Sequence, residues 1–160
     1  MRPVSWLFVP AVVAMMTCAA CAATPPAPAT PADAPTVLLN GHPFSVEIAD
    51  TPAAREHGLM DRTSMPIDHG MLFIFPDAEP RTFWMKNTLI PLDILYFDDA
   101  QRLVSVQEDV PPCRADPCPV YPSIAPARYV LELNAGVAAK LGVRNGDAIT
   151  FSDLPSSGTQ

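Results

Sequence analysis

The stretches Gly-Met-Leu-Phe-Ile-Phe at residues 70–75 and Leu-Asp-Ile-Leu-Tyr-Phe-Asp at residues 92–98 decide the fold class. The first is a short continuous apolar run, which is more typical of a buried strand than of a helix, and we interpret the second as a strand as well. Residues 98–101 (Asp-Asp-Ala-Gln) predict a turn, after which Leu-Val-Ser-Val-Gln at residues 103–107 returns as the antiparallel partner of the second run. We therefore expect a core made of strands.

Turn and cap signals predict the elements on both sides of this core. Asn40-Gly41 is typical of a hairpin turn between two strands. Thr51 followed by Pro52 is typical of the N-cap and first residue of a helix, which Gly58 would end. In chain order, the remaining predicted elements are strands over residues 36–39, 44–48, 82–87, 128–133 and 148–151 and helices over residues 53–57 and 134–142.

The number and spacing of these strands favour a β-dominated fold, between all-β and α+β. We expect a compact single-domain β-sandwich or barrel with one or two short helices. The length of 160 residues is that of one domain. The globular part is expected over residues 36–154, followed by a flexible tail over residues 155–160.

The charge of the chain argues against a nucleic-acid partner. There are 17 Asp and Glu against 10 Lys and Arg, for a net charge of −7, whereas a nucleic-acid binder shows a basic face. The sequence contains no Walker A loop, GxGxxG, HExxH or GxSxG motif. It therefore offers no common signature of a nucleotide-binding protein, a zinc protease or an α/β-hydrolase, and we expect no cofactor.

The first 20 residues have the composition of a signal peptide. One basic residue precedes an apolar run, and small residues follow it. Cys-Ala-Ala-Cys at residues 18–21 resembles a bacterial lipobox, which predicts lipidation at Cys21. The alternative is ordinary cleavage after Ala-Cys-Ala at residues 20–22.

Residues 21–35 are rich in Pro and Ala and show no apolar periodicity. Such a segment stays extended and solvated, so we interpret it as a tether between a membrane anchor and the domain. No Asp follows Cys21, which by resemblance to the lipoprotein sorting rule favours the outer membrane. We therefore expect an exported protein in the periplasm, held to the outer membrane by lipid at Cys21.

Cys113 and Cys118 are the two cysteines outside the signal segment. An exported protein meets oxidising conditions, so we predict a structural disulfide between them. A redox or metal-binding pair is the alternative, but two cysteines without a nearby histidine make a poor zinc site.

Four sequence blocks occur in an order and spacing that match a known family. The most specific reads Phe-Trp-Met-Lys-Asn-Thr-Leu-Ile-Pro-Leu-Asp-Ile-Leu at residues 83–95, and the others lie at residues 55–60, 70–75 and 130–136. Over about residues 37–151 the chain resembles the bacterial and archaeal domain of unknown function one hundred and ninety-two. The resemblance implies a compact β-rich domain that is often exported, and it implies no established reaction.

Charged residues inside the apolar stretches have two interpretations. A buried charge must be paired or hydrogen-bonded, so they could form a structural polar network. They could instead frame a site for a small polar or anionic ligand. The candidate ligand-binding residues are Arg55, Lys86, Asn87, Asp93 and Glu132. If Asp93 and Glu132 shared one cleft, they could also act as the carboxylate pair of an envelope hydrolase.

Methionine and histidine residues gather within residues 57–71. In an oxidising compartment such residues can bind Cu(I), a soft ion. The alternative is that the methionines fill the core and the histidines lie on the surface. The candidate metal ligands are His57, Met60, Met65, His69 and Met71.

The leading hypothesis is a lipid-anchored, non-catalytic module of the cell envelope that binds a small polar ligand or a partner protein. A periplasmic copper-binding protein is the first alternative, and an envelope hydrolase is the second. We interpret Phe83 and Trp84 as core residues, and the alternative is that they form an exposed aromatic platform for a ligand.

Overall fold

Seven strands form one sheet in the part of the chain that the structure, a computed structural model, describes, residues 34–152. Their order across the sheet is β6-β5-β8-β3-β2-β1-β9, and all neighbours are antiparallel except β2 and β3. The strands are β1 (Thr36–Leu39), β2 (His42–Ala49), β3 (His69–Glu79), β5 (Leu92–Phe97), β6 (Leu103–Val110), β8 (Ala127–Asn134) and β9 (Ile149–Ser152).

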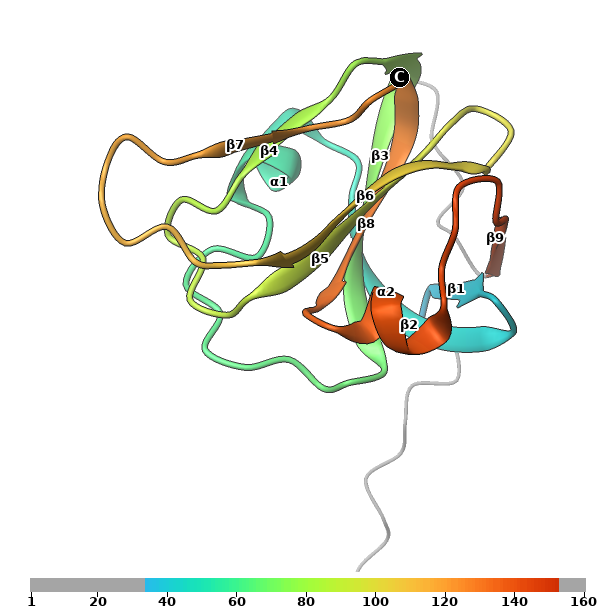
Figure 1. Cartoon of the computed structure of the whole chain (residues 1–160), viewed down its shortest axis with the longest axis horizontal. Coiled ribbons are helices and arrows are strands. Elements are labelled where there is room, and N and C mark those ends of the chain that lie inside the picture. Colours follow the sequence, from blue (N-terminus) through green and yellow to red (C-terminus); the bar gives the residue numbers. More distant parts are fainter. Residues whose placement is uncertain (1–33, 153–160) are drawn as a thin grey trace, which may run out of the picture. The chain divides into compact units, whose positions relative to one another are not determined.

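Four smaller elements complete the described part. Helix α1 (Pro52–His57) lies beside the two-stranded sheet of β4 (Thr82–Trp84) and β7 (Val120–Pro122), and α2 (Val137–Leu141) lies between β8 and β9 (Figure 1). This composition confirms the predicted β-dominated domain with two short helices.

The large sheet curls until its two edge strands meet at one end. Arg102 and Ala148 form an isolated bridge there. The N–H of Leu103 donates to the Asp147 carbonyl at 2.8 Å, and the N–H of Ile149 donates to the Gln101 carbonyl at 3.0 Å. Of the two predicted architectures, the curled sheet is therefore a half-barrel and not a sandwich.

The central strands are buried on both faces. All six residues of β5 are buried, which explains why its sequence is a continuous apolar run and not an alternating one. Alternate side chains enter two cores: Leu72, Leu95 and Leu131 pack with α2, whereas Phe73 and Tyr96 pack on the side of α1 and β4. We call these the α2-side core and the α1-side core.

One predicted strand is shorter than expected. The sequence predicts a strand through Asn87, but β4 ends at Trp84. Asn87 has a φ of 55°, a left-handed conformation that Asn tolerates and a strand does not use. The backbone carbonyls of Met85 and Asn87 accept from Cys113 and Asp61 instead of from a strand partner.

Strand β7 lies between the predicted strands at residues 103–107 and 128–133, where the sequence predicts no regular element. It pairs antiparallel with β4, so that Phe83 faces Tyr121 across the ladder. With only three residues each, these strands are stabilised by packing on the α1-side core and not by their own pairing.

The predicted signal peptide, lipidation site at Cys21, tether and tail lie wholly or almost wholly outside the described residues. Within residues 34–152, neither helix is long and apolar enough to cross a membrane.

Candidate functional site

Helix α1 forms one wall of a cleft on the α1 side of the sheet. The helix begins as the sequence predicts: Thr51 is the N-cap, its hydroxyl accepts from the N–H of Ala54 at 3.2 Å, and Pro52 occupies the first turn. It ends at Gly58, whose combination of a φ of 50° with a ψ of −134° is readily adopted only without a side chain. A Cβ at Gly58 would also come within 3.2 Å of the Phe73 ring.

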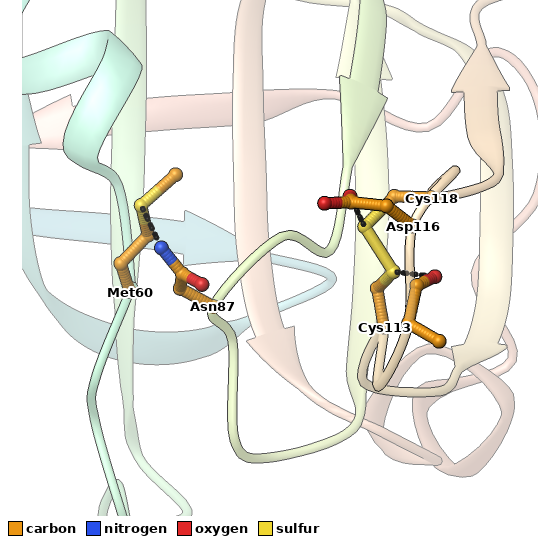
Figure 2. The surroundings of a disulfide bond; sticks show 6 residues. Met60, Asn87, Cys113, Asp116 and Cys118 are labelled. Carbon is orange, nitrogen blue, oxygen red and sulfur yellow. Dashed lines mark hydrogen bonds between the residues drawn. A yellow bond between two sulfur atoms is a disulfide. The ribbon is translucent and has the colours of Figure 1, made fainter.

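The opposite wall is the segment that follows β4. Met60 and Thr88 form an isolated bridge, and the N–H of Asp61 donates to the carbonyl of Asn87 at 2.8 Å. The Asn87 amide also approaches the sulfur of Met60, with 3.8 Å between nitrogen and sulfur (Figure 2). These contacts join the end of α1 to the opposite wall.

A disulfide-bonded loop contacts this wall at Met85 and Lys86. Cys113 and Cys118 are bonded to each other, with their Cα atoms 5.6 Å apart, so the predicted disulfide is present (Figure 2). The N–H of Cys113 donates to the Met85 carbonyl at 3.2 Å, and Cys113 forms an isolated bridge with Lys86. The cross-linked loop is therefore attached directly to the cleft wall.

The cleft has a narrow inner pocket and a wider mouth, and we call the two together the α1 cleft. The inner pocket has a volume of about 30 Å³ and the mouth one of about 400 Å³. Both are lined by Glu56, His57, Met60, Trp84 and Lys86, so they are continuous. Thr88, Phe73, Phe83 and Glu132 line only the inner pocket.

Glu132 forms the floor of the inner pocket. It lies on β8 between Met71 of β3 and Ile94 of β5, and only 4% of its surface is exposed. Within residues 34–152, no ion pair to Lys, Arg or His satisfies its carboxyl. Burial raises the pKa of Glu132 to about 8, because removing the carboxyl group from water disfavours its charged form.

Lys86 and Trp84 stand at the mouth of the cleft. The Lys86 ammonium lies 5.2 Å from the centre of the Trp84 ring, a cation–π distance. Trp84 is 45% exposed, whereas its neighbour Phe83 packs edge-on against Phe73 with ring centres 4.9 Å apart. The predicted Phe-Trp pair is thus divided: Phe83 belongs to the core and Trp84 to the cleft.

Arg55 lines the inner pocket, but its guanidinium is engaged elsewhere. Nη1 donates to the carbonyls of Asp50 at 2.5 Å and Ile74 at 2.9 Å, and the group lies over the Phe75 ring. Of the five predicted ligand residues, the structure thus brings Arg55, Lys86, Asn87 and Glu132 to the α1 cleft, with Arg55 acting mainly as a link between α1 and the sheet.

Asp93 lies on the other face of the sheet. Its carboxylate is fully buried and accepts from the N–H of Asp109 at 2.9 Å and from the N–H of Ala138 at 2.8 Å. Because Asp93 precedes Ile94, the strand partner of Glu132, the two carboxyl groups point to opposite faces. They cannot form the hydrolase pair that would require both in one cleft, and Asp93 is a structural residue.

The five predicted metal ligands are separated. His57 and Met60 line the α1 cleft, whereas Met65 and Met71 pack in the α1-side core. His69 begins β3, where its Nδ1 lies 2.8 Å from an Asp68 oxygen. Within the described residues, no three His, Cys, Asp or Glu side chains gather as a metal site.

Glu56 and Thr88 also line the inner pocket, although neither was predicted as a site residue. Neither residue carries a signal in the sequence. Glu56 lies on the short helix α1 and not inside an apolar stretch, and Thr88 is buried next to Asn87, where the chain turns.

The fold and the cleft define the class of protein: a strand-dominated single domain built on a half-barrel, with a cleft beside its first helix. The chain belongs to the DUF192 family, described as an uncharacterized ACR, whose model matches residues 36–151. The resemblance inferred from the sequence blocks is therefore confirmed.

Known relatives support this assignment. A UPF0127 protein of the archaeon Thermococcus gammatolerans is 30% identical over 117 residues, which are 70% of this chain and 67% of that protein. A crystal structure of a protein of unknown function from Novosphingobium aromaticivorans is 36% identical, with a TM-score of 0.66, and the match covers 73% of this chain and 83% of that one. A Sinorhizobium meliloti structure is 40% identical, with a TM-score of 0.66 and coverage of 75% and 93%.

Proposed function

We propose that this protein is a non-catalytic binding module that takes a small polar ligand in the α1 cleft. We further propose that it acts in the periplasm, where lipid at Cys21 would hold it to the outer membrane. The family is uncharacterised, so the ligand must be inferred from the site.

One observation carries the proposal: a buried acid without a partner forms the floor of a cleft that opens to solvent. Burying an ionisable group costs free energy that a folded protein normally offsets by hydrogen bonding or pairing. Asp93 follows this rule with two backbone donors, whereas Glu132 has no ion-pair partner among the described residues and its carboxyl group lines the cleft. A bound ligand would supply the missing partner.

The shape of the α1 cleft supports a small ligand. A mouth of about 400 Å³ lies within the range of about 300–1,000 Å³ that is common for small-molecule sites. Apolar and aromatic walls with a few polar groups are the usual lining of such sites, and Trp84, Lys86 and Glu132 provide that combination here. Because the sequence carries no common nucleophile–base motif, we propose binding and not catalysis.

The test is to screen the full mature chain by NMR against small amines, carboxylates, sugars and phosphates. We expect at least one class to shift the backbone amides of Gly58, Lys86 and Thr88 and to lose that effect in Glu132→Gln. Glu108→Gln is the matched control, because Glu108 is exposed on β6 and lines neither part of the cleft. Binding only at other surfaces, or none from any class, would overturn the proposal.

A further inference from the structure

Both acidic and basic side chains line the inner pocket, but none of the basic ones forms an ion pair with its buried acid. Glu56 and Glu132 both line it, and Glu132 lacks an ion-pair partner among the described residues. Arg55 has its Nη1 committed to two carbonyls, and the Lys86 ammonium lies over Trp84 instead. A cation that enters the pocket would therefore meet a carboxyl group that forms no ion pair within the described residues.

The walls of the pocket suit a cation as well. Phe73, Phe83 and Trp84 present aromatic rings to it, and aromatic faces attract ammonium groups. Lys86 demonstrates this preference within the molecule, because its own ammonium lies 5.2 Å from the centre of the Trp84 ring. An acid at the floor with aromatic walls is a common arrangement for recognising amines.

The size of the pocket limits which ammonium can enter. The inner pocket has room for only about one or two water molecules. A primary ammonium is close to this size, whereas a trimethylammonium is several times larger. The remainder of a ligand would lie in the mouth, which is more than ten times as large.

From these observations we infer that the ligand of the α1 cleft is a small organic amine whose primary ammonium group contacts Glu132. This inference rests on the proposed function and names the ligand class of the same site. The ammonium donates hydrogen bonds to the carboxylate at the floor, and the organic part lies along Trp84 at the mouth.

Binding of an ammonium must ionise Glu132. Burial keeps the pKa of Glu132 at about 8, so at neutral pH most of the free protein holds a proton there, which binding releases. Other titratable or charged groups on the surrounding elements are Arg55, Glu56 and His57 on α1, Lys86 after β4, and Tyr96 on β5. The Tyr96 hydroxyl donates to the Tyr121 carbonyl at 2.6 Å, and burial raises its pKa, so it stays neutral over this range.

The affinity for an amine should therefore rise with pH. From pH 6 to pH 8 the ionised fraction of Glu132 increases by a few tens of fold, and the affinity should follow it and then level off. A carboxylate ligand would show the opposite trend, because it needs the protonated acid as its donor.

Calorimetric titration of the full mature chain with four matched probes tests the inference: n-pentylamine, pentyltrimethylammonium, pentanol and pentanoate. We expect pentylamine to bind at least about tenfold more tightly than the other three, the difference typical of a charge-assisted hydrogen bond. Glu132→Gln should lose this advantage and the pH dependence, and Glu108→Gln should keep both. Trp84→Leu, at an exposed site that does not endanger folding, should weaken pentylamine binding several-fold.

Each of the other possible outcomes would contradict one part of the inference. Equal or tighter binding of pentanoate or pentanol, or no binding of pentylamine at pH 8, would exclude an amine ligand. Equal binding of pentyltrimethylammonium would contradict the restriction to primary ammonium groups. In all three cases the proposed function still stands if the NMR screen finds another ligand class in the α1 cleft, and it fails if that screen finds none.

Discussion

Asp93 and Glu132 are buried carboxyl groups on neighbouring strands, but their surroundings differ. Asp93 accepts from the N–H groups of Asp109 and Ala138, so it ties the end of β6 and the start of α2 to the centre of the sheet. Burial raises the pKa of Glu132, and this residue lines a cleft. Similar chemistry therefore serves structure at one position and, as we propose, binding at the other.

Replacement of Asp93 should destabilise the fold. Asp93→Ala would leave two buried N–H groups without an acceptor, and we expect it to lower the free energy of unfolding by about 3–5 kcal/mol. Asp93→Asn should cost less, because the amide oxygen can still accept one bond. Denaturant unfolding measures both, with Glu108→Ala as a control expected to change stability by no more than about 0.5 kcal/mol. Asp93→Ala that unfolds like the parent would contradict the structural role.

Glu132 should make the protein less stable as the pH rises. The pKa of this group is about 8 when folded and close to its ordinary value of 4.5 when unfolded, so between these values the folded state holds more protons. The free energy of unfolding therefore falls as pH rises through this window, by roughly 3–5 kcal/mol in total, and levels off above it. The contribution is fully present below pH 4.5.

Glu132→Gln removes this titration. The stability difference between the variant and the parent should grow in favour of the variant from pH 5 to pH 8, which cancels the contributions of other carboxyl groups. Denaturant unfolding at four or five pH values measures it. Parallel stability curves for the two proteins would show that Glu132 is not held in a raised-pKa environment.

At the scale of elements, the α1 cleft depends on short segments joined by cross-links. Helix α1 has six residues and β4 has three, and neither would persist alone. Arg55 links α1 to the end of β2 and to the middle of β3, and the Cys113–Cys118 loop supports the segment after β4 through Met85. The walls of the cleft are therefore ordered by their neighbours and not by their own propensity.

Removal of the disulfide should weaken this wall. Closing a loop of about six residues stabilises a protein by roughly 2 kcal/mol in the chain-entropy model, so the double variant Cys113→Ser and Cys118→Ser should lose up to that amount. Amide hydrogen exchange at Lys86 and Thr88 should accelerate more than exchange in β5. A thiol assay that found two free thiols in the unreduced mature protein would contradict the disulfide itself.

Most regular elements could be predicted from local signals. The cap Thr51-Pro52, the turn Asn40-Gly41 and the apolar run at residues 92–98 each specify their own conformation. Strand β7 could not be predicted, because its three residues pair with a distant segment and carry no alternation of their own. The strand predicted through Asn87 failed for a related reason, since long-range hydrogen bonds turn the chain there.

The site could be predicted only in part. The sequence identifies Lys86, Asn87 and Glu132 as charged or polar groups within apolar stretches, and the structure places them at one cleft. It cannot separate Asp93 from Glu132, because the faces that they occupy depend on the register between β5 and β8. The partial closure of the sheet is likewise a property of strands that lie far apart in sequence, Leu103–Val110 and Ile149–Ser152.

At the scale of the whole molecule, the proposed arrangement is a binding domain on a membrane tether. The predicted tether spans residues 21–35, and an extended chain of that length would reach roughly 40 Å. An anchored module of this kind can sample ligands in the periplasm without leaving the membrane surface.

The anchor is tested by Cys21→Ser. We expect the parent to fractionate with membranes and the variant to be released as a soluble periplasmic protein, because acyl chains contribute about 0.8 kcal/mol per buried CH₂. Mass spectrometry of the mature N-terminus provides the independent measurement. An unacylated N-terminus at Ala23 in the parent would contradict lipidation and support the alternative cleavage.

The proposed binding site depends on the protonation state of one carboxyl group, that of Glu132. Carbon-13 NMR of the full mature chain, with the Glu132 side-chain carboxyl resonance assigned by comparison with Glu132→Gln, measures its titration directly. We predict an apparent pKa near 8 in the ligand-free protein. A pKa close to the ordinary value of 4.5 would mean that Glu132 is solvated or paired, and it would contradict the proposal that an unpartnered acid forms the floor of the α1 cleft.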